Sequence, residues 1–517
     1  MTLRILLYAL AALSCLLGPA RGQADVEAQR LDAVKEFKRF YRKFKEVPQK
    51  VEAIYTLKGN ECVPACDELL KLLTDAQEDI RRAALDVVTT YGADATWEHV
   101  LGSLKDRRGA DRAAVIDAVG RAGIKSAVPV LVELGADKDA ETRYAVLRAL
   151  GRLGDPSVSD LVVALLGDPD LRVRVAAADA VTDLRLKAAG TALLPLLDDS
   201  AWQVQAAAIK ALGIVRPAEA IMPLIGLMRK GGRLREDAAD ALFSITTMDF
   251  GTDPDEWQKQ MERLFRLEWR PPTDAEVEKA RLARKKSAAF YGAKDDVKTF
   301  ANIPIVSDYV LFIVDVSGSM SDLVVERDKF QGYEDYQKLT IVKSELSKTV
   351  DSLGPNTYFN IVAFASDLKP WKSYLVPANI TNKESARAWI KNLRSIGGAA
   401  DQELANVGLS SNIAEGKTNT FKALMFPFGI DPEQPRRAAT TAPSAVAKVK
   451  LDTVYFLSDG RPSVGKVVDT EEIRKAVKEE NQVYKIVLHT IAIGEFQKEF
   501  LNALAVDNGG VFVDLGR

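Results

Sequence analysis

The sequence predicts a multidomain fold, an α-solenoid followed by an open, doubly wound α/β domain. Two observations predict it. In the first half of the chain an alanine-rich segment returns about every 31 residues. In the second half, apolar runs of strand length alternate with helical patterns. The first feature is typical of solenoids, and the second is typical of a mostly parallel sheet covered by helices. The 517 residues are enough for several packed cores.

Residues 1–22 are predicted to be a cleaved signal peptide. A short basic start is followed by the apolar run Ile5–Gly18, and Ala20-Arg21-Gly22 places small residues where a signal peptidase acts. The run is too short for a comfortable membrane span, so an uncleaved anchor is the weaker alternative. A lipoprotein signal at Cys15 is weaker still. We therefore expect an exported protein, in the periplasm, outside the cell or on its surface.

Residues 23–60 are predicted to form a helical lead-in, because Val34, Phe37, Tyr41 and Phe44 recur at helical spacing beside a basic face. A solvated face is favoured over a membrane or acidic-partner contact. The cysteines that follow, Cys62 and Cys66, could pair in an oxidising compartment, or remain unpaired if Pro64 starts a helix.

Residues 61–266 contain the repeats. The repeated segments begin at Arg81, Arg112, Arg143, Arg174, Gln205 and Arg235. Each alanine-rich segment is predicted to be a helix paired with a leucine-rich antiparallel helix, and we expect Gly120, Gly151 and Gly213 to end such helices. The arginines should line one ridge and pair with neighbouring aspartates rather than bind a ligand. The units resemble short bacterial HEAT-like repeats, whose stacked array offers an extended interaction surface.

A linker is predicted over residues 267–303, because Pro271-Pro272 stops the preceding helix and Asp274–Phe290 is a charged, solvated helix. The α/β domain is predicted over residues 304–517. Its expected strands are Tyr309–Asp315, Tyr358–Phe364, Thr453–Leu457, Tyr484–Ile493 and Val511–Val513. Its expected helices are Leu339–Leu353, Lys383–Leu393, Asn419–Met425, Glu471–Glu479 and Gln497–Ala505. Ligands of such sheets bind at the carboxyl ends of the strands, where the strand order reverses.

Oxygen-bearing side chains follow the predicted strands. Asp315-Val-Ser317-Gly-Ser319 ends the first strand, Thr418 precedes a helix, and Asp459 follows a later strand. Carboxylate and hydroxyl oxygens are the ligands that Mg²⁺ or Mn²⁺ prefers. The pattern resembles the metal-ion-dependent adhesion site (MIDAS) of von Willebrand factor A-type (VWA) domains, which are Rossmann-like. The resemblance implies that Asp315, Ser317, Ser319, Thr418 and Asp459 hold Mg²⁺ (or Mn²⁺ or Ca²⁺), and that a carboxylate of a protein partner completes the site.

One loop departs from that family's pattern. Its usual Gly-Gly-Thr could be sought at Gly397-Gly398, but Ala399 follows. We therefore interpret residues 399–415 as an insertion before Gly416-Lys-Thr418, with Thr420 as the alternative ligand; residues 431–450 form a second insertion. Gly416-Lys-Thr418 also resembles the end of a phosphate-binding loop, but position 411 is serine where that motif needs glycine.

Composition limits the function further. The formal net charge is −2, which does not favour a nucleic-acid binder, and His99 and His489 are the two histidines of the sequence. Past the signal run, no apolar stretch is long enough to span a bilayer. We predict a non-enzymatic, divalent-metal-dependent protein-binding or adhesion scaffold. The alternatives are an exported metal-dependent hydrolase and a structural envelope protein with a non-functional metal site. The pattern does not predict an oligomeric state.

Overall fold

A computed structural model describes residues 23–267, 269–291, 299–325, 327–333, 335–406, 415–433, 450–494 and 498–515. The predicted signal peptide, residues 1–22, lies outside these ranges, as do residues 434–449 of the second predicted insertion. One compact unit of the chain ends at Leu153 and a second begins at Gly154.

The described part of the first unit is helical. Its helices are α2 (Gln23–Tyr41), α3 (Val47–Tyr55), α4 (Val63–Leu72), α5 (Glu78–Val88), α6 (Asp94–Ser103), α7 (Gly109–Ala122), α8 (Val128–Leu134) and α9 (Ala140–Leu153). Helix α5 packs against α3 and α4, and α9 packs against α7 and α8. The predicted helical lead-in consists of the two helices α2 and α3, with Val34 and Phe37 of α2 buried as their spacing predicts. Small buried residues such as Ala83, Ala84 and Ala149 allow the close helix packing.

The second unit begins with further helices of the same kind. They are α10 (Ser159–Leu165), α11 (Leu171–Leu184), the 3-10 helix η4 (Thr191–Asp198), α12 (Trp202–Val215), α13 (Ile221–Met228), α14 (Arg233–Thr246), α15 (Pro254–Phe265) and α16 (Asp274–Tyr291). Helix α12 lies between α11 and α14, and α14 also packs against α13. Trp257 of α15 is fully buried against Phe250, and its indole N–H donates to the carbonyl of Gly251 at 2.7 Å. This tryptophan closes the last repeat of the set.

The expectation that Gly120, Gly151 and Gly213 end their helices is wrong. All three lie inside α7, α9 and α12, which continue for two more residues. A Cβ at Gly120 would lie 2.7 Å from Cα of Ala149, and one at Gly213 would lie 3.3 Å from Cα of Ala241. Gly120 and Gly213 are therefore needed for close backbone approach between neighbouring helices, not for a left-handed turn.

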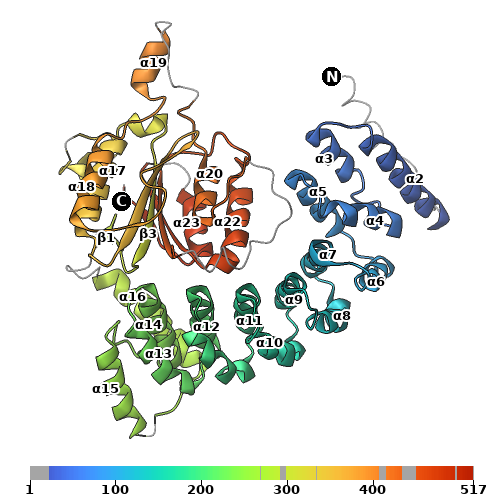
Figure 1. Cartoon of the computed structure of the whole chain (residues 1–517), viewed down its shortest axis with the longest axis horizontal. Coiled ribbons are helices and arrows are strands. Elements are labelled where there is room, and N and C mark those ends of the chain that lie inside the picture. Colours follow the sequence, from blue (N-terminus) through green and yellow to red (C-terminus); the bar gives the residue numbers. More distant parts are fainter. Residues whose placement is uncertain are drawn as a thin grey trace. The chain divides into compact units, whose positions relative to one another are not determined.

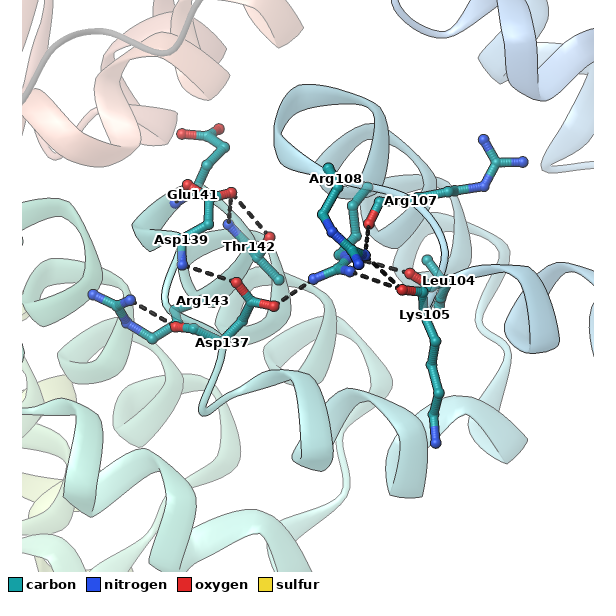
Figure 2. A network of polar contacts seen from close by, with 10 residues as sticks. Leu104, Lys105, Arg107, Arg108, Asp137, Asp139, Glu141, Thr142 and Arg143 are labelled. Atoms are coloured by element: carbon teal, nitrogen blue, oxygen red, sulfur yellow. Dashed lines mark hydrogen bonds and ion pairs between the residues drawn. The ribbon is translucent and has the colours of Figure 1, made fainter.

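The repeated arginines act within the helical array, as predicted. Figure 2 shows the network around Asp137 in the first unit. The guanidinium of Arg112 donates to the carbonyls of Leu104 at 3.1 Å and Lys105 at 3.2 Å, and forms an ion pair with Asp137. Arg143 donates to the carbonyl of Asp137 at 2.8 Å. The turn at Asp137 is thereby tied to α7 through Arg112 and to α9 through Arg143.

The same contact recurs in other repeats. Backbone carbonyls six residues earlier accept hydrogen bonds from Arg81 (Asp75, 2.7 Å), Arg174 (Asp168, 2.7 Å) and Gln205 (Asp199, 2.8 Å). Arg174 also forms an ion pair with Asp199 at 2.7 Å. These side chains satisfy carbonyls that helix ends leave free, which is a structural role.

Cys62 and Cys66 are unpaired. Cys62 precedes helix α4, whose second residue is Pro64, and Cys66 is buried one turn later. Burial raises the pKa of the Cys66 thiol to about 12. Of the two alternatives left open by the sequence, the structure therefore has the unpaired one.

The α/β part of the second unit contains a sheet of seven strands among the described residues. The strands are β3 (Tyr309–Asp315), β4 (Tyr358–Phe364), β5 (Leu368–Pro370), β6 (Val376–Pro377), β7 (Thr453–Ser458), β8 (Val487–Ala492) and β9 (Phe512–Asp514). The order is β5-β4-β3-β7-β8-β9, with β6 beside β4. Strands β4, β3, β7, β8 and β9 are parallel, and β5 and β6 run antiparallel to β4. A two-stranded ribbon, β1 (Thr299–Phe300) and β2 (Ile303–Pro304), precedes the sheet.

Helices cover both faces of this sheet. They are α17 (Lys338–Ser352), α18 (Ile380–Lys391), α20 (Thr420–Met425), α22 (Thr470–Tyr484) and α23 (Lys498–Asp507), whereas a further helix, α19 (Ala399–Asn406), covers neither face. Figure 1 shows α17 and α18 on one face, α20, α22 and α23 on the other, and α19 projecting away from the sheet. The strand predicted over Tyr484–Ile493 is wrong at its start, since Tyr484 ends α22 and Lys485 follows it at φ 57°. The central strands are buried on both faces, as their continuous apolar runs predict.

Candidate metal centre

The strand order reverses between β3 and β7. From β3 the chain crosses to β4 on one side, whereas β7, β8 and β9 follow on the other. Strands β3 and β7 are parallel and in register from Val310↔Thr453 to Val314↔Leu457, so their carboxyl ends lie side by side. Asp315 ends β3 and Ser458 ends β7. This is the position at which doubly wound sheets bind ligands.

Asp315 is fully buried at this edge. One of its carboxylate oxygens accepts from the backbone N–H of Ser317 at 2.8 Å, and the other accepts from the hydroxyl of Ser458 at 2.6 Å. Burial, and then the charge of Asp459, raise the pKa of Asp315 to about 7, although the hydrogen bonds from the two serines act in the opposite direction. A cation bound here would relieve the cost of burying this charge.

The two serines of the first loop connect the two carboxylates. The 3-10 turn η6 (Gly318–Ser321) places the hydroxyls of Ser317 and Ser319 3.4 Å apart. Ser319 donates to one oxygen of Asp459 at 2.8 Å. Asp315, Ser317, Ser319 and Asp459 thus form one connected group, assembled from residues 140 positions apart in the chain.

Thr418 lies against the same group. Its backbone N–H donates to the hydroxyl of Ser463 at 2.9 Å, and its carbonyl accepts from the N–H of Ser463 at 2.9 Å. A Cβ at Gly460 would lie 3.3 Å from the Thr418 hydroxyl and 3.6 Å from the Ser319 hydroxyl. The two hydroxyls therefore face a cradle that a side chain at Gly460 would fill. The alternative, Thr420, is buried in the first turn of α20, where its hydroxyl has no hydrogen-bond partner.

The loop before Thr418 closes tightly. The carbonyl of Gly416 accepts from the N–H of Gly318 at 3.0 Å, and a Cβ at Gly416 would lie 2.6 Å from Cα of Gly397. The chain therefore leaves at Gly397 and returns at Gly416, and α19 lies in the predicted insertion between them. Asp401 of this insertion accepts from the N–H of Gly397 at 2.7 Å, which ties α19 to the rim of the site.

The residues present suit a hard divalent cation. Two buried carboxylates and three hydroxyls converge at the strand ends, and these are oxygen donors of the kind that Mg²⁺ and Ca²⁺ select. Among the residues that the structure describes, no group of three or more His, Cys, Asp or Glu could hold a metal. A metal ion at these strand ends would therefore need hydroxyl or water oxygens beside the two carboxylates.

Comparison with known proteins gives matches for both halves of this architecture. A family model described as HEAT repeats matches residues 98–181 and 159–242. The chain is 25% identical over 211 residues to inter-alpha-trypsin inhibitor heavy chain H3 of Mus musculus, covering 40% of this chain and 19% of that protein. It is 26% identical over 170 residues to a von Willebrand factor A domain-containing protein of Dictyostelium discoideum, covering 33% of this chain and 6% of the other. The chain therefore combines repeats similar to HEAT repeats with an α/β domain that is similar to VWA domains.

The matches span a fifth or less of the length of these relatives. Among solved structures, a von Willebrand factor type A protein from Catenulispora acidiphila is 16% identical, with a TM-score of 0.27, and the match covers 41% of this chain and 39% of that one. No helix in the described ranges is both long and apolar enough to cross a membrane.

The two histidines lie outside the candidate site of the α/β domain. His489 is in β8, where its ring stacks on Tyr455 at 4.9 Å and its Nδ1 accepts from the N–H of Val511 at 3.0 Å. Burial lowers the pKa of His489 to about 4. The ring is half-buried and its Nδ1 is satisfied by the backbone, which is a structural role. His99 lies in the HEAT repeats and contacts Asp67 at 2.9 Å.

The sequence reasoning missed two side chains of this centre. Ser458, which holds Asp315, directly precedes Asp459, so its place at the end of a strand could have revealed it. Lys338 is the first residue of α17, and its ammonium lies 2.6 Å from Asp459. No motif marks this lysine, because a lysine that opens a helix is ordinarily solvated.

Proposed function

We propose that this chain is an exported, non-enzymatic scaffold whose VWA domain binds a carboxylate of a protein partner through Mg²⁺. Asp315, Ser317, Ser319, Thr418 and Asp459 are the residues that would hold the ion. The HEAT repeats are proposed to supply a second interaction surface. Mn²⁺ or Ca²⁺ could take the place of Mg²⁺, since both accept the same oxygen donors.

The observation that supports the proposal best is the convergence of these side chains at the strand-order reversal. Asp315 and Asp459 come from different strand ends, yet Ser317, Ser319 and Ser458 connect them by hydrogen bonds. Asp315 and Asp459 are both buried and repel each other, and Lys338 offsets the charge of Asp459, so a cation would offset the charge of Asp315 that remains.

The residues of the proposed metal site have different roles. Asp315 and Asp459 supply the negative charge, and their hydrogen bonds fix the direction of each carboxylate. Gly460 keeps space between the hydroxyls of Ser319 and Thr418. When bound, a divalent cation would supply an open coordination position for an incoming carboxylate.

Two further parts of the proposal concern where the protein acts and what it contacts. Export rests on the apolar run Ile5–Gly18 and the small residues after it. N-terminal sequencing of the protein recovered from its producing cells should give a chain that begins near Gln23. A chain that retains Met1 would contradict cleavage. The second surface rests on the repeats, which expose the flanks of stacked helices.

The binding function can be tested by affinity capture with three versions of the mature chain. These are the wild type, Asp315→Ala, and Asp351→Ala as a control whose carboxylate is half exposed and pairs with Arg387. We expect a partner that binds the wild type and the control in Mg²⁺, and that is lost in EDTA and in Asp315→Ala. A partner that stays bound in EDTA and to Asp315→Ala would contradict a metal-dependent site. Hydrolysis of a phosphoester or peptide library by the wild type and not by Asp315→Ala would favour the enzymatic alternative.

A further inference from the structure

A lysine is built into the candidate metal centre. Lys338 is 8% exposed, although it is a long cationic side chain that opens a helix. Its backbone N–H donates to the carbonyl of Asp322 at 3.0 Å, which fixes the start of α17 close to the first metal-site loop. Buried ammonium groups are rare in proteins and normally require a charged partner.

That partner is Asp459. The ammonium of Lys338 lies 2.6 Å from one carboxylate oxygen, and the other oxygen accepts from Ser319 at 2.8 Å. The Asp459 side chain is 1% exposed, so solvent screens this ion pair little. Both carboxylate oxygens of Asp459, a proposed metal ligand, therefore already contact side chains of the protein.

The backbone that follows β8 lines the place of this lysine. A Cβ at Gly494, which follows β8, would lie 3.5 Å from both Cε and Nζ of Lys338 and 3.9 Å from Cβ of Asp459. Gly494 has a φ of 129°, a conformation that other residues rarely adopt. The end of β8 therefore forms one wall of the place that the ammonium occupies.

The ion pair changes the charge that a divalent cation would meet. Asp315 and Asp459 together carry two negative charges when ionised, and Lys338 offsets one of them. We propose that Lys338 is a resident cation of this centre, which balances Asp459 in the metal-free protein and holds the affinity for Mg²⁺ low. The ion would then be bound tightly only when the carboxylate of a partner adds its own charge. This inference rests on the metal-dependent function proposed above.

The test is a calorimetric Mg²⁺ titration of the mature chain at low ionic strength. Lys338→Met keeps the apolar stem and removes the charge. Lys338→Gln also removes the charge but keeps a hydrogen-bond donor toward Asp459. Lys348→Met is the matched control on the same helix, because Lys348 is 65% exposed and pairs with Glu345 at 3.0 Å. We expect both Lys338 variants to bind Mg²⁺ about tenfold more tightly or better, because a nearby positive charge has been removed. The control should match the wild type.

The outcomes separate this inference from the proposed function. Wild-type binding with no gain in either Lys338 variant would overturn the inference and leave the metal site standing. Weaker binding by Lys338→Met with wild-type binding by Lys338→Gln would show a positioning residue and would also overturn it. Binding by the Lys338 variants alone would support the inference, because the affinity of the wild type would then be too low to detect until a partner carboxylate adds its charge. Absence of binding in all folded chains would overturn both. Circular dichroism verifies folding, and if Lys338→Met does not fold, Lys338→Gln decides by the same criteria.

Discussion

Replacing Gly120 by alanine should loosen the packing between helices α7 and α9. The added Cβ would lie 2.7 Å from Cα and 2.8 Å from Cβ of Ala149, well inside normal contact distance. Overpacking of this kind costs about 1–3 kcal/mol. Backbone atoms cannot rotate away as a side chain can, so we take the upper end of that range. The better helix propensity of alanine offsets about 1 kcal/mol. The expected net loss is about 2 kcal/mol.

Hydrogen exchange measured by mass spectrometry on peptides from α7 and α9 reports this change locally. A loss of about 2 kcal/mol corresponds to exchange that is about 30-fold faster in these helices. Gly102→Ala is the matched control, because Gly102 lies in α6 with nothing within 4 Å of its Cβ position. It should slow exchange or leave it unchanged. If Gly120→Ala exchanged as slowly as the wild type, the close approach of α7 and α9 would be refuted.

Two further substitutions test the α/β part of the chain. Gly460→Ala should weaken Mg²⁺ binding by about 10–100-fold, because its methyl group would lie 3.3 Å from the Thr418 hydroxyl; unchanged affinity in a titration would argue against Thr418 as a ligand. Burial raises the pKa of Asp452 from its ordinary value of 3.8 to about 6, so the folded protein holds this proton more tightly than the unfolded chain does. The resulting penalty is absent below about pH 4, grows between pH 4 and 6, and reaches about 3 kcal/mol above that. Asp452→Asn should therefore gain stability relative to the wild type as the pH rises through this window. Chemical denaturation of both proteins at pH 4 and pH 7 measures the difference in their free energies of unfolding, and the same difference at both pH values would contradict the prediction.

Periodicity in the sequence predicted the helical half of the fold well, but it did not predict the ends of its helices. A glycine near the end of an alanine-rich segment suits two roles, a left-handed cap or a close helix contact. Gly120 has the second role and Gly123, three residues later at φ 73°, has the first. Only the position of Ala149 on the neighbouring helix separates the two roles, and that is tertiary information.

The α/β half shows a similar division between local and tertiary signals. The long apolar runs predicted β3, β4 and β7, because strands buried on both faces carry a continuous hydrophobic signal. Strands β5 and β6 were not predicted, since they have three and two residues and owe their pairing to β4.

The five candidate ligands were selected from motifs, and the structure places Asp315, Ser317, Ser319 and Asp459 in one hydrogen-bonded group with Thr418 beside it. Motif spacing carries this information for the two aspartates and the two serines because their segments directly follow β3 and β7, whose ends are fixed by the sheet; Thr418 instead precedes α20. Lys338 lies outside any such motif. It is buried against the backbone at Gly494 and pairs with the carboxylate of Asp459, and neither residue is near it in sequence.

The most direct test of the central claim is a calorimetric titration of the mature chain with Mg²⁺, alongside Asp315→Ala and the control Asp351→Ala. We predict saturable binding at one site in the wild type and in the control, and none in Asp315→Ala. Absence of Mg²⁺ binding by the folded wild type and by the folded Lys338 variants, or an Asp315→Ala chain that binds Mg²⁺ as well as the wild type, would contradict the proposed metal centre.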